Sequence, residues 1–600
     1  MTDKTDSIAI VGGGAAAVTA LCEILKKLND SPSSLERLSI DVFDINQTLG
    51  AGFAYDPEQW SPCQLMNHSG WNQQTPRPHE LDKPQEWSFN DFLVWLGTEN
   101  GLQCLEQHPE FYSVLGIEDL NSWKPDPEVF YPRGLFGYYL QNVFAETVDA
   151  LKKMGIPVTV HSETEVIGYE TALAKTSLTY RHDNTVSLSQ PFKNIIVLTG
   201  HWPCTRSTSD FIIDGTKKAT ERFLALDNTP KKSNIGFIGM GLTGIDYLIE
   251  TASYFGNFNR QIDGQFTYTA HPGKKISFQC FSRNGLFSNV RPIGWKNFPK
   301  QHWTEQQLKA IYKEGFALKD LITLVTKEAR VIDPNLSWRR LVGLDSAGAE
   351  NYLDKCISDA KNPNSTGAKL FFLLSSMAYG NLPAHTDKGL GLFFNLVGDI
   401  YANLNSASQQ EFRKSFLSHY IRHFAPTSMV NGEKLKALFN AGVLNTHATH
   451  SYADLCPTSN GVDVVYIENG VEKNVNCARV FMAIGQSGKI TEHPSTLMQQ
   501  LLKDFGAPHS SPENDRVTEL SVNKNYRLVS GEEYSGTSTN APSDFFLLGP
   551  ALAAWGIDRG FLTGYTDALA KVVESIFESE ANNSYIQGLN FFEAKREQRY

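Results

Sequence analysis

The stretch SIAIVGGGAAAVTA, residues 7–20, decides the fold of this 600-residue chain. An apolar, β-branched run ends in three glycines and continues directly into alanines, a pattern typical of a strand, a tight turn and a helix. Gly12, Gly14 and Ala17 fit the pattern G-x-G-x-x-G/A, in which small residues allow the turn, the approach of a pyrophosphate and the packing of helix on strand. The free N–H groups that begin the helix would face the anion. The stretch therefore predicts a dinucleotide-binding turn.

The residues that follow supply the rest of such a unit. Leu38–Phe43 is predicted as the second strand, and it ends at Asp44. A carboxylate at this position of a Rossmann fold accepts both ribose hydroxyl protons, which suits a nucleotide without a 2′-phosphate. Gly50 and Gly52 come next, and we expect their backbone to lie close under a flat ring or a phosphate. The alternative for these two glycines is an ordinary loop.

The opening pattern repeats beyond residue 230. SNIGFIGMGLTGIDYLIETA contains Gly239, Gly241 and Gly244, again after a β run and before a helix. The next strand ends at Arg283 instead of an acid. A guanidinium there would pair with a 2′-phosphate, although a solvated surface arginine is the alternative. We therefore expect a nucleotide with a free ribose in the first unit and NADP(H) in the second.

The order of the remaining segments predicts that the second unit is inserted in the first. Hairpins with turns at 183–184 and 469–470 each precede a buried strand, and a last strand ends at Gly549 before a loop with Asp558. Between them lies a helical region, in which Ser408 and Glu411 are expected to form a capping box. The fold class is thus α/β, with two Rossmann-like dinucleotide-binding domains. The expected bounds are 1–220 and 465–600 for the first domain and 221–464 for the second, including a helical insertion at about 300–445.

Composition narrows the class of partner. The formal net charge of -11 argues against nucleic acid, because phosphate binding needs a basic face. Apolar runs are too short to span a bilayer, and nothing resembles a signal peptide. The eight cysteines are scattered without a C-x-x-C pair, so we expect reduced thiols and a cytoplasmic protein. His419 and His423 have zinc-helix spacing but no third ligand, so no metal is expected.

Five segments carry a family likeness: IAIVGGG (8–14), DVFDINQTLGAGFAY (41–55), LMNHSG (65–70), YPRGLFGYYL (131–140) and FSRNGLFSNVRP (281–292). With them the chain resembles the bacterial FAD/NAD(P)-binding flavoproteins that include aspartate N-monooxygenase (nitrosuccinate synthase), within the two-dinucleotide-binding-domain flavoproteins. The resemblance implies FAD on the first fold and NADPH on the second. It implies these residue roles: Gly12, Gly14, Ala17, Asp44, Gly549 and Asp558 for FAD, Gly239, Gly241, Gly244 and Arg283 for NADPH, and Asn67 near the isoalloxazine as the catalytic candidate.

The absence of a cysteine pair close in sequence argues against the disulfide reductases of this architecture. Hydride transfer from NADPH to the flavin and reaction with oxygen remain, because the flavin carries the difficult step. We expect an FAD- and NADPH-dependent monooxygenase that N-hydroxylates a small amine or amino acid through a C4a-hydroperoxyflavin. Arg291 and Arg133 are candidates for a substrate carboxylate, a structural salt bridge or FAD phosphate contact being the alternative for each.

Three other functions stay open at this stage. One is an NADPH-linked flavin reductase or oxidase, and a second is another heteroatom or Baeyer–Villiger oxygenase. The third is a non-catalytic, flavin-binding sensor or interaction protein whose helical insertion binds a partner. Two complete glycine turns favour turnover, because a sensor needs no second nucleotide site.

Overall fold

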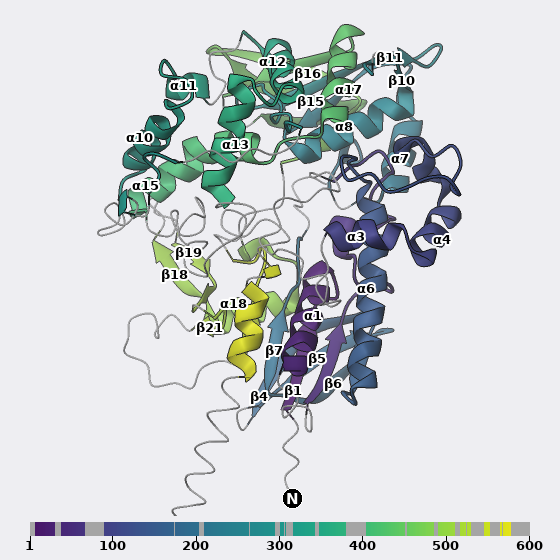
Figure 1. Cartoon of the computed structure of the whole chain (residues 1–600), viewed down its shortest axis with the longest axis vertical. Coiled ribbons are helices and arrows are strands. Elements are labelled where there is room, and N and C mark those ends of the chain that lie inside the picture. The colour runs from purple at the N-terminus through teal and green to yellow at the C-terminus, as the bar shows by residue number, and fades with distance from the viewer. Residues whose placement is uncertain are drawn as a thin grey trace, which may run out of the picture.

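The computed structural model of the chain contains two five-stranded parallel β-sheets, of which the first, with β1 and β7, lies in the lower half of the view (Figure 1). The structure describes residues 6–30, 38–66, 89–172, 175–202, 209–215, 217–262, 264–293, 300–304, 306–307, 316–341, 347–379, 404–450, 453–484, 490–510, 516–523, 525–529, 545–552, 565–566 and 568–577.

The first sheet has the strand order β22-β7-β1-β2-β3, with all neighbours parallel. Its strands are β1 (Asp6–Val11), β2 (Leu38–Phe43), β3 (Val158–His161), β7 (Asn194–Val197) and β22 (Phe545–Leu547). Helices α1 (Ala15–Asp30) and α6 (Arg133–Lys153) pack against each other beside it. The strands read as continuous apolar runs because both faces of a parallel sheet are covered.

The second sheet repeats this plan with the order β13-β12-β9-β17-β8, again parallel throughout. Its strands are β8 (Ile212–Ile213), β9 (Lys232–Ile238), β12 (Lys275–Ser282), β13 (Leu444–Ala448) and β17 (Arg479–Met482). Helix α7 (Ala219–Asp227) precedes β9, and α8 (Leu242–Phe255) follows it. Because β22 returns to the first sheet after β17, the second fold is inserted in the first, as the sequence predicted.

The strand pairing places both limits of the second domain outside the expected bounds of 221 and 464. The predicted second domain, 221–464, omits β8 and β17, which both belong to the second sheet. The limit at 464/465 also cuts through β15 (Gly461–Glu468). The strands of the second fold therefore run from Ile212 to Met482. The sequence placed the limit too early because the hairpin before β17 has the same pattern as the one before β7.

A three-stranded antiparallel unit precedes one parallel strand in each fold, β7 in the first and β17 in the second. These units are β4 (Thr164–Ala172), β5 (Lys175–His182) and β6 (Thr185–Phe192), and β14 (Asp454–Thr458), β15 and β16 (Val471–Cys477). The turns Asp183–Asn184 and Asn469–Gly470 have positive φ at both residues, which type I′ hairpins require. The predicted hairpins are confirmed.

The expected helical insertion contains a separate apolar core. Its helices are α10 (Leu318–Ala329), α11 (Trp338–Leu341), α12 (Ala349–Lys361), α13 (Thr366–Tyr379), α15 (Ser406–Glu411), the π-helical turn η5 (Phe412–Phe416), α16 (Leu417–Phe424) and α17 (Met429–Asn440). The predicted capping box is wrong. The N-cap of α15 is Asn405, which accepts from the N–H of Ser408, and the Ser408 hydroxyl accepts from the N–H of Leu318. The Ser408 hydroxyl therefore accepts the first N–H of α10, a distant helix, and does not cap the start of its own helix.

Smaller elements complete the description: α2 (Gly52–Tyr55), α3 (Phe89–Leu96), α4 (Glu99–Gln107), η2 (Pro109–Phe111), α5 (Tyr112–Leu115), β10 (Gly256–Arg260), β11 (Phe266–Ala270), η6 (Ile490–Glu492), α18 (Thr496–Phe505), β18 (Ala507–Ser510), β19 (Arg516–Glu519), β20 (Ser521–Val522) and β21 (Leu528–Val529). Among the helices described, none has the length and apolar character that crossing a bilayer demands.

Candidate functional site

The two glycine turns share one hydrogen bond and one backbone conformation. The N–H of Gly12 donates to Phe43 O at 2.8 Å, and the N–H of Gly239 donates to Phe281 O at the same distance. Their φ angles are 106° and 110°, in a region that L side chains rarely adopt. The first turn thus ties the end of β1 to the end of β2, and the second ties the end of β9 to the end of β12.

In both turns a backbone carbonyl just after a neighbouring parallel strand packs against the first glycine. A Cβ on Gly12 would lie 2.2 Å from Leu198 O, just after β7, and one on Gly239 would lie 2.4 Å from Ala483 O, just after β17. Neither position accepts a side chain without displacing backbone. The third position also has a packing reason, because a Cβ on Gly244 would lie 2.1 Å from Gly239 O. Ala17, its counterpart, is fully buried.

The middle glycine of the second turn borders open space. A Cβ on Gly241 would meet no atom within 4 Å, and Gly241 is the N-cap of α8 without a side-chain cap. The first N–H groups of α8 therefore face a space into which an anion fits. In the first turn Gly14 approaches Gly52, whose Cα lies 3.1 Å from the Cβ that Gly14 lacks. The residues present therefore fit a pyrophosphate at the second turn, whereas at the first turn the lack of a side chain at Gly14 allows close packing on Gly52.

The residues expected to distinguish the two nucleotides lie at the turns. One Asp44 oxygen accepts the N–H of Gly13 at 2.5 Å and the other accepts the N–H of Asn46 at 2.7 Å. Arg283 follows β12, whose tip pairs with that of β9, and its Nη1 donates to Lys414 O at 3.1 Å. Their contacts with ribose or 2′-phosphate remain predictions.

The other predicted cofactor residues divide into three groups. Gly50 donates its N–H to Gly13 O at 2.7 Å, and a Cβ on Gly50 would lie 2.7 Å from Leu140 O, so backbone packing alone requires a glycine there. Gly549 lies two residues beyond the end of β22 and has a φ of 102°. Asn67 and Asp558 lie outside the described residues.

Arg133 is engaged in a structural contact. Its Nη2 lies 2.8 Å from Asp246 Oδ2 of α8, and its Nε donates to Leu65 O at 3.0 Å. Burial raises the pKa of Asp246 to about 6, which the nearby Arg133 charge partly opposes. Arg133 thus forms the structural salt bridge that was the alternative to a substrate contact. This ion pair joins α6 of the first fold to α8 of the second.

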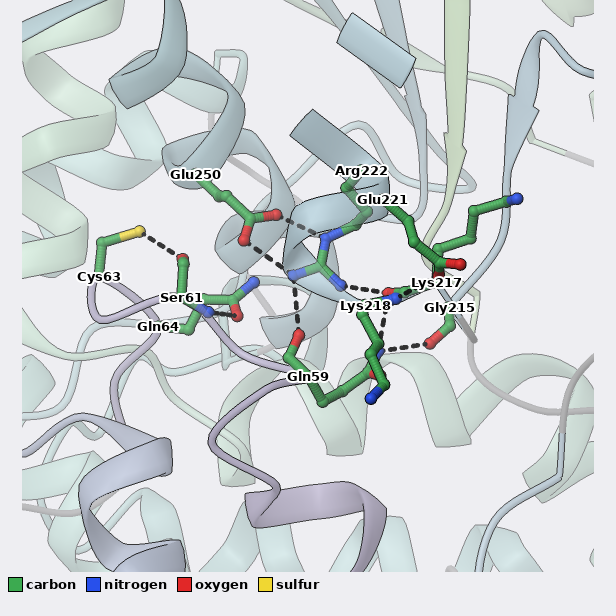
Figure 2. Close-up of polar contacts among 10 residues, drawn as sticks. All are labelled: Gln59, Ser61, Cys63, Gln64, Gly215, Lys217, Lys218, Glu221, Arg222 and Glu250. Carbon is green, nitrogen blue, oxygen red and sulfur yellow. Dashed lines mark hydrogen bonds and ion pairs between the residues drawn. The ribbon is translucent and has the colours of Figure 1, made fainter. Parts of the chain in front are cut away.

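A second ion pair lies further along α8 (Figure 2). Arg222 of α7 binds both carboxylate oxygens of Glu250, through Nε at 2.7 Å and Nη2 at 2.8 Å, and both side chains are buried. The same Nη2 donates to Gln59 O at 3.0 Å, so the pair also holds the loop after α2. Trp60 of that loop stacks on Tyr247.

Sequence reasoning missed these interdomain residues, although one signal was present. Asp246 and Glu250 are acids four residues apart in an otherwise apolar helix, and both are buried. Residues at this spacing share one helix face, so two such acids predict two cationic partners. The partners themselves come from distant parts of the chain and leave no local pattern.

Arg291 lies on the wall of a cavity of about 1340 Å³. The cavity is lined from the first fold by the segments at 61–65 and 110–130, and from the second by the end of α8, β10, β11 and α17. Burial raises the pKa of Cys63 in this wall to about 11. The seven cysteines within the described ranges are free thiols, and no cluster of three metal-binding side chains occurs among the residues described.

Comparison with known proteins supports a nucleotide-binding fold for the N-terminal part. No curated protein matches the chain. Among solved structures it is similar to the ornithine N-hydroxylase of Kutzneria sp. 744 (12% identity, 96% of this chain and 100% of that chain, TM-score 0.47). It is also similar to the ornithine hydroxylase of Pseudomonas aeruginosa (10%, 96% and 99%, TM-score 0.48) and the L-lysine 6-monooxygenase of Pseudomonas syringae (13%, 96% and 99%, TM-score 0.47). Residues 9–201, from β1 to just beyond β7, match the FAD-NAD(P)-binding family.

Proposed function

We propose that the chain binds FAD in the first fold and NADPH in the second, and that it is a flavin-dependent monooxygenase that N-hydroxylates a small amine or amino acid. The observation that carries the proposal is the duplicated glycine turn, with the same hydrogen bond and the same closing carbonyl in both folds. The family match over residues 9–201 supports FAD in the first fold. A chain with two such turns can bring two coenzymes together.

Each fold contributes a distinct set of contacts to this proposal. The N–H groups at the starts of α1 and α8 bind the pyrophosphates, and Asp44 and Arg283 distinguish a free ribose from a 2′-phosphate. When bound, FAD would supply the oxygen-activating chemistry and NADPH the hydride. The Arg133–Asp246 ion pair and the hydrogen bond from Arg222 to Gln59 O fix the second fold against the first, so that the distance between the two coenzymes stays constant.

The cysteines favour oxygen over a thiol relay as the electron acceptor. The chain has no cysteine pair close in sequence, and the described thiols are all free. Burial raises the pKa of Cys63 to about 11 and that of Cys104 to about 12, so neither forms the thiolate that disulfide exchange needs at neutral pH.

Purification of the full chain and steady-state kinetics test the proposal. We expect bound yellow flavin, and oxidation of NADPH in preference to NADH that a panel of amines and amino acids stimulates. The productive compound gives a hydroxylamine and little peroxide. A colourless protein indifferent to added FAD would overturn the proposal. Complete release of peroxide with every compound would instead assign a flavin reductase or oxidase.

A further inference from the structure

The cavity beside α8 has no residue of either glycine turn among the described residues that line it. Its wall contains Ser253 and Tyr254, at the end of a helix whose N-cap is Gly241. A helix of this length spans about 21 Å at 1.5 Å per residue. The cavity is therefore at the opposite end of α8 from the site proposed for the NADPH pyrophosphate.

One cation in this wall has no acidic partner. Lys434 of α17 places its ammonium 5.5 Å from the ring centre of Phe258 and 5.6 Å from that of Phe266, on the β10–β11 hairpin. No hydrogen bond or ion pair of that ammonium occurs among the described residues. Burial lowers the pKa of Lys434, as expected for an ammonium in apolar surroundings.

The neighbouring Lys436 shows the contrast on the same helix. Its ammonium lies 2.9 Å from Glu350 and 2.8 Å from Asp354, at the surface of α12. The chain thus neutralises one lysine of α17 with two carboxylates and directs the other toward aromatic rings and a cavity. An ammonium held this way gains stability when a ligand brings a negative charge.

The other charges of the wall favour an anionic ligand. Arg291 and Arg260 are further cations. Of the three lining acids, Glu250 has both oxygens bound by Arg222, Glu110 lies 3.1 Å from His108, and Glu128 is exposed to solvent. The rest of the wall is mainly apolar and includes Val114, Leu115 and Ile293.

We infer that this cavity is a third ligand site, separate from both coenzyme sites, and that it takes a small organic carboxylate with an apolar body. The Lys434 ammonium, which lies near the rings of Phe258 and Phe266, binds the carboxylate, and Arg291 is the second cation of the site. The apolar walls cover the body of the ligand. Arg291 is also the residue that the sequence offers for a substrate carboxylate, but the site is defined by its own residues and its test does not require the proposed reaction.

Binding of 8-anilinonaphthalene-1-sulfonate, followed by its fluorescence, tests the site on the full chain. We expect octanoate to displace the dye at least tenfold more effectively than octan-1-ol, because only octanoate carries the charge. Lys434→Met keeps the alkyl stem and should weaken dye and octanoate binding tenfold or more. Lys434→Arg should stay within about threefold of the wild type, and Lys436→Met is the matched control that should not change binding.

Three results would overturn the inference. Equal displacement by octanoate and octan-1-ol would leave no role for the cation, and this comparison needs no variant. Unchanged octanoate binding by a folded Lys434→Met protein would remove the residue from the site. Displacement of the dye by NADP⁺ or FAD would make the cavity part of a coenzyme site. None of these readouts requires turnover, so the inference and the proposed function fail separately.

Discussion

Single residues at the second glycine turn separate folding from coenzyme binding. Gly239 has a φ of 110° and a closing carbonyl within 2.4 Å of its missing Cβ, whereas Gly241 has an ordinary φ of -77° and open space. Gly239→Ala should therefore destabilise the fold by about 1–3 kcal/mol from backbone strain, with a further cost from the clash. Gly241→Ala should fold normally but place a methyl group where the pyrophosphate approaches.

The two substitutions are compared by thermal unfolding and by NADPH kinetics. We expect a lower melting temperature only for Gly239→Ala, and a KM for NADPH raised about tenfold for Gly241→Ala with its flavin content unchanged. A normal KM for NADPH in Gly241→Ala would remove the N-terminus of α8 from the coenzyme site.

The buried Asp246 predicts a pH dependence of stability. The pKa of Asp246 is about 6 in the folded chain and 3.8 for a solvent-exposed Asp, as in the unfolded chain. Between pH 3.8 and pH 6 the folded state therefore binds more protons than the unfolded state. The free energy of unfolding therefore falls as pH rises through this range, and the effect is complete only above pH 6. Between pH 5 and 7 the wild type should lose about 1 kcal/mol relative to Asp246→Asn.

Urea unfolding at pH 5 and pH 7 measures that difference. At pH 5 most of the wild-type Asp246 is already a neutral carboxyl, and at pH 7 it is the carboxylate that pairs with Arg133, whereas the asparagine of the variant does not titrate. Only the change with pH of the difference between the two proteins therefore bears on Asp246. The same difference between wild type and variant at both pH values would mean that Asp246 is ionised throughout.

At the scale of elements, helices α7 and α8 are joined by one buried ion pair. Arg222→Met would leave the Glu250 carboxylate buried and unpaired, and would also remove the hydrogen bonds that Arg222 donates to Gln59 O and Lys217 O. We expect a loss of about 3–5 kcal/mol in the free energy of unfolding. The double variant Arg222→Met with Glu250→Met should recover part of this loss, because no charge is left in the core.

An exposed pair provides the control for chemical denaturation. Arg181 and Glu165 lie 3.0 Å apart on β5 and β4, with 46% and 42% of their side chains exposed. Arg181→Met should cost under about 1 kcal/mol, because water screens such pairs. A cost for Arg222→Met that is no larger than this would contradict the structural role of the α7–α8 pair.

Elements that depend on local pattern could be predicted from the sequence, and contacts between distant segments could not. Gly12 and Gly239 form the strand-to-helix turns that the G-x-G-x-x-G/A pattern predicts, and the residues of the two hairpin turns predict the type I′ conformation. Ser408 was misread because its hydroxyl is used by α10, which no short-range pattern reveals. Arg133 and Lys434 show the same limit, since the sequence cannot tell which cation has a carboxylate partner.

At the scale of the whole molecule, the first fold extends into the second. Trp60 follows α2 of the first fold, yet it is buried in the apolar core of the second and stacks on Tyr247. The Arg133–Asp246 ion pair joins α6 to α8, and Arg222 of α7, which is paired with Glu250 of α8, donates to Gln59 O of the first fold. The insertion also gives two chain crossings between the folds. These contacts predict that the two folds unfold together.

Differential scanning calorimetry with one core substitution in each fold tests this cooperativity. Phe546 of β22 and Phe237 of β9 are both fully buried, so Phe546→Ala and Phe237→Ala should each cost about 3–5 kcal/mol. If the folds are coupled, each substitution lowers the same single transition, although the two residues belong to different sheets. Two transitions, of which each substitution moves only one, would mean that Trp60 and the ion pairs of α8 do not couple the folds. The spacing of the two coenzyme sites would then have to be fixed by the ligands themselves.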